Sequence, residues 1–195
     1  LIDAFSGTLA APDGMHVPNG VTAENVARRY GVSREDQDRF AYHSHMRAKA
    51  AIEEGRFKDE IVPVEVPAGK RGADPVRFDT DEHVRYDTTL EKLASLRPAF
   101  QEDGTVTAGN SSGINDGAAA VLMMSAEWAE DEGYAPLGRV RGTGVAGTEP
   151  DVMGIGPIHS TPKALRAAGV EMGDIGLAEL NEAFASQALA CAQVL

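Results

Sequence analysis

The run Ala178–Ala185, Ala-Glu-Leu-Asn-Glu-Ala-Phe-Ala, is the stretch whose residue types and order best suit chemistry. It places Asn181 and Glu182 between a short apolar approach, Ile175–Leu180, and an Ala-rich run of helical character. This pattern predicts a strand-to-helix corner. In open α/β sheets such corners lie at the carboxyl ends of strands and the amino ends of helices, where ligands bind. Asn181 is therefore a candidate ligand-binding residue, and the alternative is that it is an ordinary helix N-cap.

A second stretch, Thr105–Gly117, is dense in Gly, Ser and Asn. So many small polar residues permit a close approach of the backbone to a ligand or to a neighbouring segment. Ser112 lies in this stretch and is a second candidate, although Gly- and Ser-rich loops are also common without any binding role. The pair Gly154 and Gly156 lacks the rest of a dinucleotide-binding fingerprint.

Cysteine and histidine residues give no pattern of covalent or metal chemistry. The only cysteine, Cys191, lies in an Ala-rich run, and we expect it to pack as a small hydrophobic residue rather than act as a nucleophile. His43 and His45 are two residues apart, so they do not share a face of a helix. No spacing typical of metal ligands is present, and no metal site is predicted.

The composition narrows the class of protein. The chain has 195 residues and a formal net charge of -12, which argues against nucleic acid or an anionic membrane as a general partner. A single cysteine excludes an internal disulfide and favours a reducing compartment, so we predict a cytoplasmic protein. No apolar run approaches the roughly 20 residues that a membrane span needs. The chain opens on Leu1 and closes on Leu195 as if within helices, so we expect it to be a piece of a longer protein.

Helix signals divide the chain into elements that would position these residues. Residues 22–30 read as a helix that Gly31 ends, and Ser33 reads as the N-cap of a helix that runs to about Glu54. The run 88–91, Thr-Thr-Leu-Glu, resembles a capping box before a short helix that ends near Leu96. Further helices are predicted over 126–132 and, from the pair Thr161 and Pro162, over 161–168.

Strand signals occur in four segments. Residues 60–66 alternate with β-branched residues, and 118–124 is an apolar run of a length suited to a buried strand. Residues 137–147 form a Gly-interrupted strand-like run, and 175–180 precede the Asn181 corner. The last third of the chain thus alternates strand and helix, which predicts α/β layering.

Four separated blocks of the sequence resemble the thiolase family, in the order in which that family has them. The blocks cover nearly the whole chain, which makes the resemblance far more specific than any single match. They are Gly20–Ala27, Gly55–Pro63, the pair Leu96–Phe100 and Val106–Gly113, and the Met153–Pro157 run followed by the Asn181 block.

The resemblance implies an α/β protein with part of the layered α/β/α/β/α thiolase fold and an inserted α+β loop domain. Residues 1–113 would be the loop domain that binds coenzyme A. Residues 114–134 would end the N-terminal core domain, and 135–195 would start the C-terminal core domain. The implied activity is that of an acyl-CoA C-acyltransferase, which performs reversible thiolysis of 3-oxoacyl-CoA or Claisen condensation through an acyl-cysteine. Coenzyme A thioesters are the substrates, no cofactor is implied, and a homodimer or homotetramer is expected.

The family's covalent catalysts fall outside the region of resemblance. Its nucleophilic cysteine lies upstream of the region that matches Leu1, and its Gly-His-Pro and Cys-Gly-Gly blocks lie downstream of Leu195. We therefore expect the isolated segment to be inactive. The alternative hypothesis is a non-catalytic module that binds coenzyme A or assists assembly with the same fold.

Three residues at the corner match family positions that serve the acyl group. Asn181 matches the asparagine that holds a water molecule in the oxyanion hole, a task suited to a neutral amide with fixed geometry. Ala183 and Phe184 match residues that line the acyl and pantetheine pocket.

Three further residues match positions along the coenzyme A chain. Ser112 matches a serine near the pantetheine arm, and Ala108 matches a small neighbour that lets the arm pass. Arg85 matches a loop-domain arginine beside the adenine, where a guanidinium can stack and counter phosphate charge. The alternative for Arg85 is a plain surface residue.

Two departures bear on substrate preference. Many family members have His-Met-Gly where this chain has Pro18-Asn19-Gly20, and those residues shape the acyl end of the pocket. The run 86–89, Tyr-Asp-Thr-Thr, is more similar to the broad, degradative thiolases than to the short-chain biosynthetic ones.

Overall fold

Helices dominate the computed structural model, which describes residues 17–69 and 74–195. The elements, in order, are the helices α2 (Asn19–Tyr30) and α3 (Arg34–Glu53), the strands β1 (Val64–Val66) and β2 (Val76–Phe78), the helices α4 (Leu90–Ala94) and α5 (Ala126–Asp131), the 3-10 helix η1 (Pro150–Ile155), the helix α6 (Gly156–Ala168), the 3-10 helix η2 (Met172–Asp174) and the helix α7 (Ala185–Val194). The predicted helical start at Leu1 lies outside the described residues.

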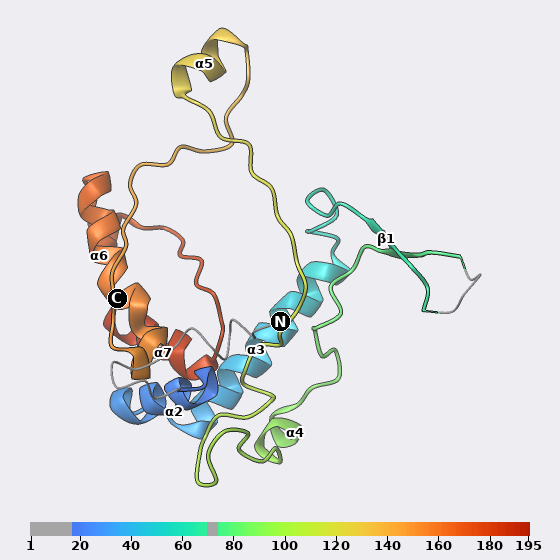
Figure 1. The fold of residues 1–195 in the computed structure, drawn as a ribbon, viewed down its shortest axis with the longest axis vertical. Helices are drawn as coiled ribbons and strands as arrows, with labels where there is room; N and C mark the ends of the chain where they lie inside the picture. Colours follow the sequence, from blue (N-terminus) through green and yellow to red (C-terminus); the bar gives the residue numbers. More distant parts are fainter. Residues whose placement is uncertain (1–16, 70–73) are drawn as a thin grey trace.

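The core lies where α2, α7 and η1 meet. Its buried cluster consists of Val26, Val32, Val152, Ile155 and Ala190. The helix α3 packs against α4 and α7 beside this cluster. Figure 1 shows these helices gathered at one end of the molecule, with the β1–β2 hairpin standing out to one side. The core therefore joins elements from the first and last quarters of the chain.

The helix ends follow the local signals in the sequence. Ser33 accepts a hydrogen bond from the Asp36 backbone nitrogen at 3.0 Å, which caps α3, and Thr89 caps α4 in the same way through the Lys92 nitrogen at 3.2 Å. Gly31 ends α2 with a φ of 65°. The predicted helices, the Ser33 cap and the Gly31 end are therefore confirmed, although α2 begins at Asn19 rather than Thr22 and the cap of α4 is Thr89, the second residue of the capping-box run.

The helix α6 begins at Gly156 instead of at the predicted Thr161–Pro162 pair. Pro157 occupies its first turn, where the missing backbone N–H has no helical partner to lose. Pro162 lies inside the helix. The prediction that Pro162 marks the start of the helix was therefore wrong, and Pro157 is the proline in the first turn. Gly169 ends the helix with a φ of 67°, as predicted.

Three of the predicted strands are absent. Residues 118–124, 137–147 and 175–180 are not paired with any other described segment, and Val121 and Leu122 are 83% and 79% exposed. A strand needs a neighbour for its backbone groups, and no described residue supplies one. Of the predicted strand 60–66, only Val64–Val66 forms, because only these residues have a pairing partner. The partner is the antiparallel strand Val76–Phe78, which the sequence did not indicate.

The segment before η1 nevertheless shows the burial pattern of a strand with one covered face. From 141 to 148 the residues alternate between exposed and half-buried. The half-buried face lies on α6, where Lys163 donates to the Val145 carbonyl at 3.0 Å and Arg141 donates to the Ala168 carbonyl at 3.2 Å. Figure 1 shows this segment returning along α6 from a long excursion with α5 at its tip. Among residues 17–69 and 74–195, no helix has the length and apolar character needed to cross a bilayer.

Gly144 sets how closely this segment approaches α6. A Cβ atom on Gly144 would lie 2.4 Å from the Ser160 carbonyl oxygen and 2.6 Å from the Ala164 nitrogen. Both are backbone atoms, which cannot rotate away. We expect Gly144→Ala to lower the stability of the protein by about 1–3 kcal/mol, the usual cost of an overpacked contact, as measured by the urea midpoint. The control is Gly147→Ala, because no atom of the described residues, apart from its own chain neighbours, lies within 4 Å of the new methyl group. Equal midpoints for the two variants would contradict the proposed contact.

Candidate functional site

The Asn181 corner is paired with the Gly- and Ser-rich stretch. Ser111 and Phe184 form an antiparallel bridge, the Ser112 nitrogen donates to the Ala183 carbonyl at 2.9 Å, and the Ala185 nitrogen donates to the Asn110 carbonyl at 2.9 Å. Two stretches that the sequence singled out separately therefore lie side by side. The helix α7 begins only at Ala185, with Phe184 in the N-cap position. The alternative that Asn181 caps this helix is therefore wrong.

A cleft of about 250 Å³ opens between α3 and this pair of segments. Asn181 and Ser112 both line it, although they are far apart in sequence. Its other lining residues come from α3, from the 83–84 stretch and from the two paired segments, and are Phe40, Ala41, Ser44, His45, Ala48, His83, Val84, Gly109, Asn110, Ser111, Glu182 and Ala185. This is the candidate site.

The other predicted residues lie around the cleft rather than in its wall. Phe184 is half-buried and meets Phe100 edge to face, with ring centroids 6.2 Å apart. Ala183 is half-buried on the paired strand segment, and Ala108 is exposed beside it. Arg85 is exposed next to the lining residue Val84. Two of the six residues thus line the cleft, and the other four lie within two residues of a lining residue in the chain.

A larger hollow, of about 370 Å³, lies between α3 and α7. It shares Phe40, Ser44 and Glu182 with the cleft. None of the six predicted residues lines it. The smaller cleft is therefore the better candidate, because the residues suited to chemistry are there.

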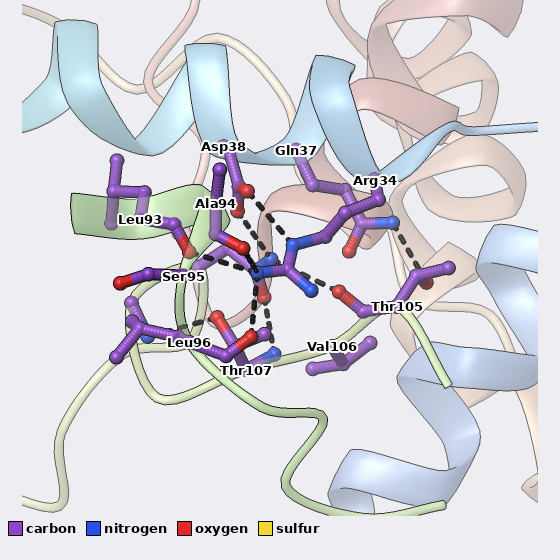
Figure 2. Close-up of polar contacts among 12 residues, drawn as sticks. Arg34, Gln37, Asp38, Leu93, Ala94, Ser95, Leu96, Thr105, Val106 and Thr107 are labelled. Carbon is purple, nitrogen blue, oxygen red and sulfur yellow. Dashed lines mark hydrogen bonds and ion pairs between the residues drawn. The ribbon is translucent and has the colours of Figure 1, made fainter. Parts of the chain in front are cut away.

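A buried polar frame holds the cleft wall against α3. Asp38, which is 4% exposed, accepts from the Asn110 amide at 3.0 Å with one carboxylate oxygen and from Arg34 at 2.8 Å with the other. The Asn110 side-chain oxygen in turn accepts from the Thr107 backbone nitrogen at 2.8 Å. Figure 2 shows the Arg34 guanidinium between Asp38 and the chain that follows α4. It donates there to the Leu93 carbonyl at 2.8 Å and to the Leu96 carbonyl at 2.9 Å.

A second buried carboxylate fixes the start of the same stretch. Glu24 of α2, 3% exposed, accepts from the Thr105 nitrogen at 2.9 Å and from the Val106 nitrogen at 2.8 Å. The Thr105 hydroxyl also donates to it at 3.1 Å and accepts from Gln37 at 3.0 Å. Charged acceptors of this kind make stronger hydrogen bonds than neutral ones. The path of the backbone into Ser112 is therefore set by side chains of α2 and α3.

Two polar contacts on the cleft were not predicted. Ser44 donates to the Glu182 carboxylate at 2.5 Å, which links α3 to the corner. The His45 and His83 rings lie with centroids 6.0 Å apart, and the His45 Nδ1 atom accepts from the Arg85 backbone nitrogen at 3.3 Å. No spacing in the sequence could have signalled contacts between residues so far apart.

Cys191 packs as predicted. It is fully buried, its Sγ atom lies 3.6 Å from the Gly154 carbonyl oxygen, and burial raises the pKa of its thiol. A thiol in this setting is a poor nucleophile, because the thiolate is the reactive form. Within residues 17–69 and 74–195, no group of three or more His, Cys, Asp or Glu side chains is placed to hold a metal ion.

The family comparison covers nearly all of the chain. Residues 6–127 match the model described as "Thiolase, N-terminal domain", and residues 134–195 match "Thiolase, C-terminal domain". Among curated proteins, an acetyl-CoA acetyltransferase of Chromobacterium violaceum is 55% identical over 90% of this chain and 44% of its own length. A 3-ketoacyl-CoA thiolase of Bacillus subtilis is 57% identical over 87% of this chain and 45% of its own length. The chain therefore spans about half the length of the curated relatives it matches.

Solved structures confirm the predicted fold class. The acetyl-CoA acetyltransferase of Bacillus anthracis matches 98% of this chain with a TM-score of 0.91 and 46% identity, over 48% of its own chain. Human mitochondrial 3-ketoacyl-CoA thiolase matches 98% of this chain with a TM-score of 0.88 and 42% identity, over 47% of its own chain. The chain thus carries a partial thiolase-like α/β fold.

The forked donors of Arg34 make a testable contribution. A lysine keeps the charge, but its compact ammonium cannot match the planar fork that joins Asp38 to two carbonyls. We expect Arg34→Lys to destabilise the protein by about 1–3 kcal/mol, the value of hydrogen bonds to charged groups, as measured by urea unfolding. Arg39→Lys is the matched control, because Arg39 on the same helix is 60% exposed and pairs only with Asp36 among the described residues. An equal loss of unfolding free energy in both variants would show that the stability of the polar frame does not depend on the forked donors of Arg34.

Proposed function

The chain belongs to the thiolase family, and from that membership we propose that the full-length protein is an acyl-CoA C-acyltransferase. Its reaction would be the reversible thiolysis of a 3-oxoacyl-CoA, or the reverse Claisen condensation, through an acyl-cysteine. Because Cys191 is buried and its thiol pKa is raised, the nucleophile must come from residues outside this chain. This agrees with relatives that are about twice as long.

One observation carries the proposal: Asn181 and Ser112, from separate segments, line the same cleft. In thiolysis, a cysteine thiolate adds to the 3-oxo carbon and the C2–C3 bond then breaks, leaving an acyl-cysteine and the enolate of a shorter acyl-CoA, which takes up a proton. A coenzyme A thiolate next attacks the acyl-cysteine and releases the cysteine thiolate. Each step develops negative charge on an oxygen, and a fixed neutral amide can stabilise that charge through a water molecule.

The other predicted residues suit the coenzyme A chain in this proposal. Ser112 and Ala108 would flank the pantetheine arm, and Ala183 and Phe184 would contact the arm and the acyl group. Arg85 is exposed beside the cleft, where a guanidinium can meet a phosphate or stack on adenine. The homodimeric or homotetrameric state, the cytoplasmic location and the preference for degradative substrates remain part of the proposal.

The alternative, a module that binds coenzyme A without catalysis, is supported by the buried state of the chain's only cysteine. Calorimetric titration of the full-length protein with coenzyme A, combined with a thiolysis assay on acetoacetyl-CoA, separates the two. Binding together with turnover supports the acyltransferase. Binding without turnover supports the module.

Removal of the Asn181 amide tests the oxyanion role. We expect Asn181→Ala in the full-length protein to lower kcat by about 10²- to 10³-fold, the usual loss when one oxyanion donor is removed. KM and the affinity for coenzyme A would change little, because the interaction is made mainly in the transition state. Steady-state thiolysis kinetics and calorimetry provide the two measurements. A variant whose kcat is unchanged would remove Asn181 from the mechanism.

A further inference from the structure

The stretch 83–86, which borders the cleft, is tied to α3 by two side chains one turn apart. His45 accepts the backbone N–H of Arg85 through Nδ1 at 3.3 Å. The Lys49 ammonium lies 6.0 Å from the centroid of the Tyr86 ring. Residues 83–86 contain no helix or strand, so their position depends on side-chain contacts of this kind.

His83 extends the contact to the opposite wall of the cleft. Its ring centroid lies 6.0 Å from that of His45, and both rings line the cleft. A Cβ atom on Gly113 would lie only 3.0 Å from the His83 ring. His83 therefore fills the space between α3 and the loop that carries Ser112.

The hydrogen bond to Arg85 requires one protonation state of His45. A neutral imidazole has one nitrogen that accepts, whereas an imidazolium carries a hydrogen on both nitrogens. For Nδ1 to accept this N–H, His45 has to be neutral with its proton on Nε2. Protonation would replace the acceptor by a donor that faces another donor.

The surroundings of His45 favour the neutral form. Burial lowers its pKa below the ordinary 6.5, and the nearby His83 and Arg85 lower it further. The Glu182 carboxylate opposes this effect, but it already accepts a hydrogen bond from Ser44. Lys49, on the next turn of α3, pairs with Glu53 at 4.0 Å and does not contribute to this shift. The hydrogen bond from Arg85 to His45 is therefore complete at neutral pH and above. It is lost as the pH falls through the lowered pKa of His45, which lies below the ordinary 6.5.

We propose that His45 is a positioning residue that, as a neutral acceptor, holds the Arg85 stretch at the rim of the cleft, so that acid weakens the grip on coenzyme A. The positional part stands on the geometry alone, and the part concerning coenzyme A rests on the proposed function. The ligand group that we infer is the phosphate-bearing end of coenzyme A, because the backbone that His45 holds carries the Arg85 guanidinium. His45 itself need not touch the substrate.

The kinetic test compares His45→Asn, His45→Ala and wild type in the full-length protein. Asparagine places a neutral oxygen near the position of Nδ1, so it can accept the same N–H at every pH, whereas alanine cannot. The assay is thiolysis of acetoacetyl-CoA with coenzyme A varied, between pH 8 and pH 5.5. His43→Asn is the matched control, because His43 is exposed on the same helix and does not line the cleft.

We expect the wild-type KM for coenzyme A to rise in acid by roughly 2- to 10-fold relative to that of His45→Asn, the effect of one net hydrogen bond. His45→Ala would show the raised KM already at pH 8, and kcat would change little in either variant. The His43→Asn profile would follow that of wild type. Ionisation of the substrate affects all four proteins equally, so it cancels in these ratios. Parallel profiles for wild type and His45→Asn would overturn the proposal.

Amide exchange gives a second measurement that needs no activity. The exchange of the 83–86 backbone, corrected for its intrinsic pH dependence, would accelerate in acid in wild type and stay slow in His45→Asn. Equal exchange in the two proteins would overturn the positional inference. If wild type performs no thiolysis at any pH while its exchange follows His45, the proposed function fails and the positional inference stands.

Discussion

Two buried carboxylates determine where the cleft wall runs. Glu24 and Asp38 are almost completely buried, and a buried charge is tolerated only when its oxygens are hydrogen-bonded. The donors that meet this demand are backbone N–H groups of 105–106 and the side chains of Asn110 and Arg34. The turn before Ser112 can therefore take one path, and that path brings it alongside the Asn181 corner.

Elements whose signals are local were predicted well, and elements that need a distant partner were not. Ser33 caps its helix and Gly31 and Gly169 end theirs because each acts within a few residues of itself. Residues 118–124 and 137–147 carry the composition of strands, but composition does not supply the neighbouring strand. The alternating burial along 141–148 shows that the strand pattern is real, with α6 on one face and no described strand beside it.

The candidate site shows the same division. Asn181 and Ser112 could be found because each belongs to a distinctive block of sequence, and the fold places both in one cleft. The side chains that hold those blocks in place could not be found. The bond between Asp38 and Asn110 and the contact between His45 and His83 join residues with no common motif. Such contacts follow from the packing of helices, which sequence patterns constrain only loosely.

One face of α3 positions three segments that lie in or near the cleft wall. Residues four or three apart on a helix share a face, and this spacing applies to Arg34, Asp38, Ala41, His45 and Lys49. Arg34 holds the end of α4 and the residues after it, Asp38 holds the 105–110 turn, and His45 holds the 83–86 stretch. Each segment is fixed to this helix, and the segment after α4 is in addition bridged to the 105–110 turn through Pro98 and Thr107. The Arg34–Asp38 end is an ion pair whose carboxylate is almost fully buried, whereas the His45 end is half-buried and neutral. An acid-sensitive contact can therefore act on one rim of the cleft while the frame beneath Asn110 keeps its geometry.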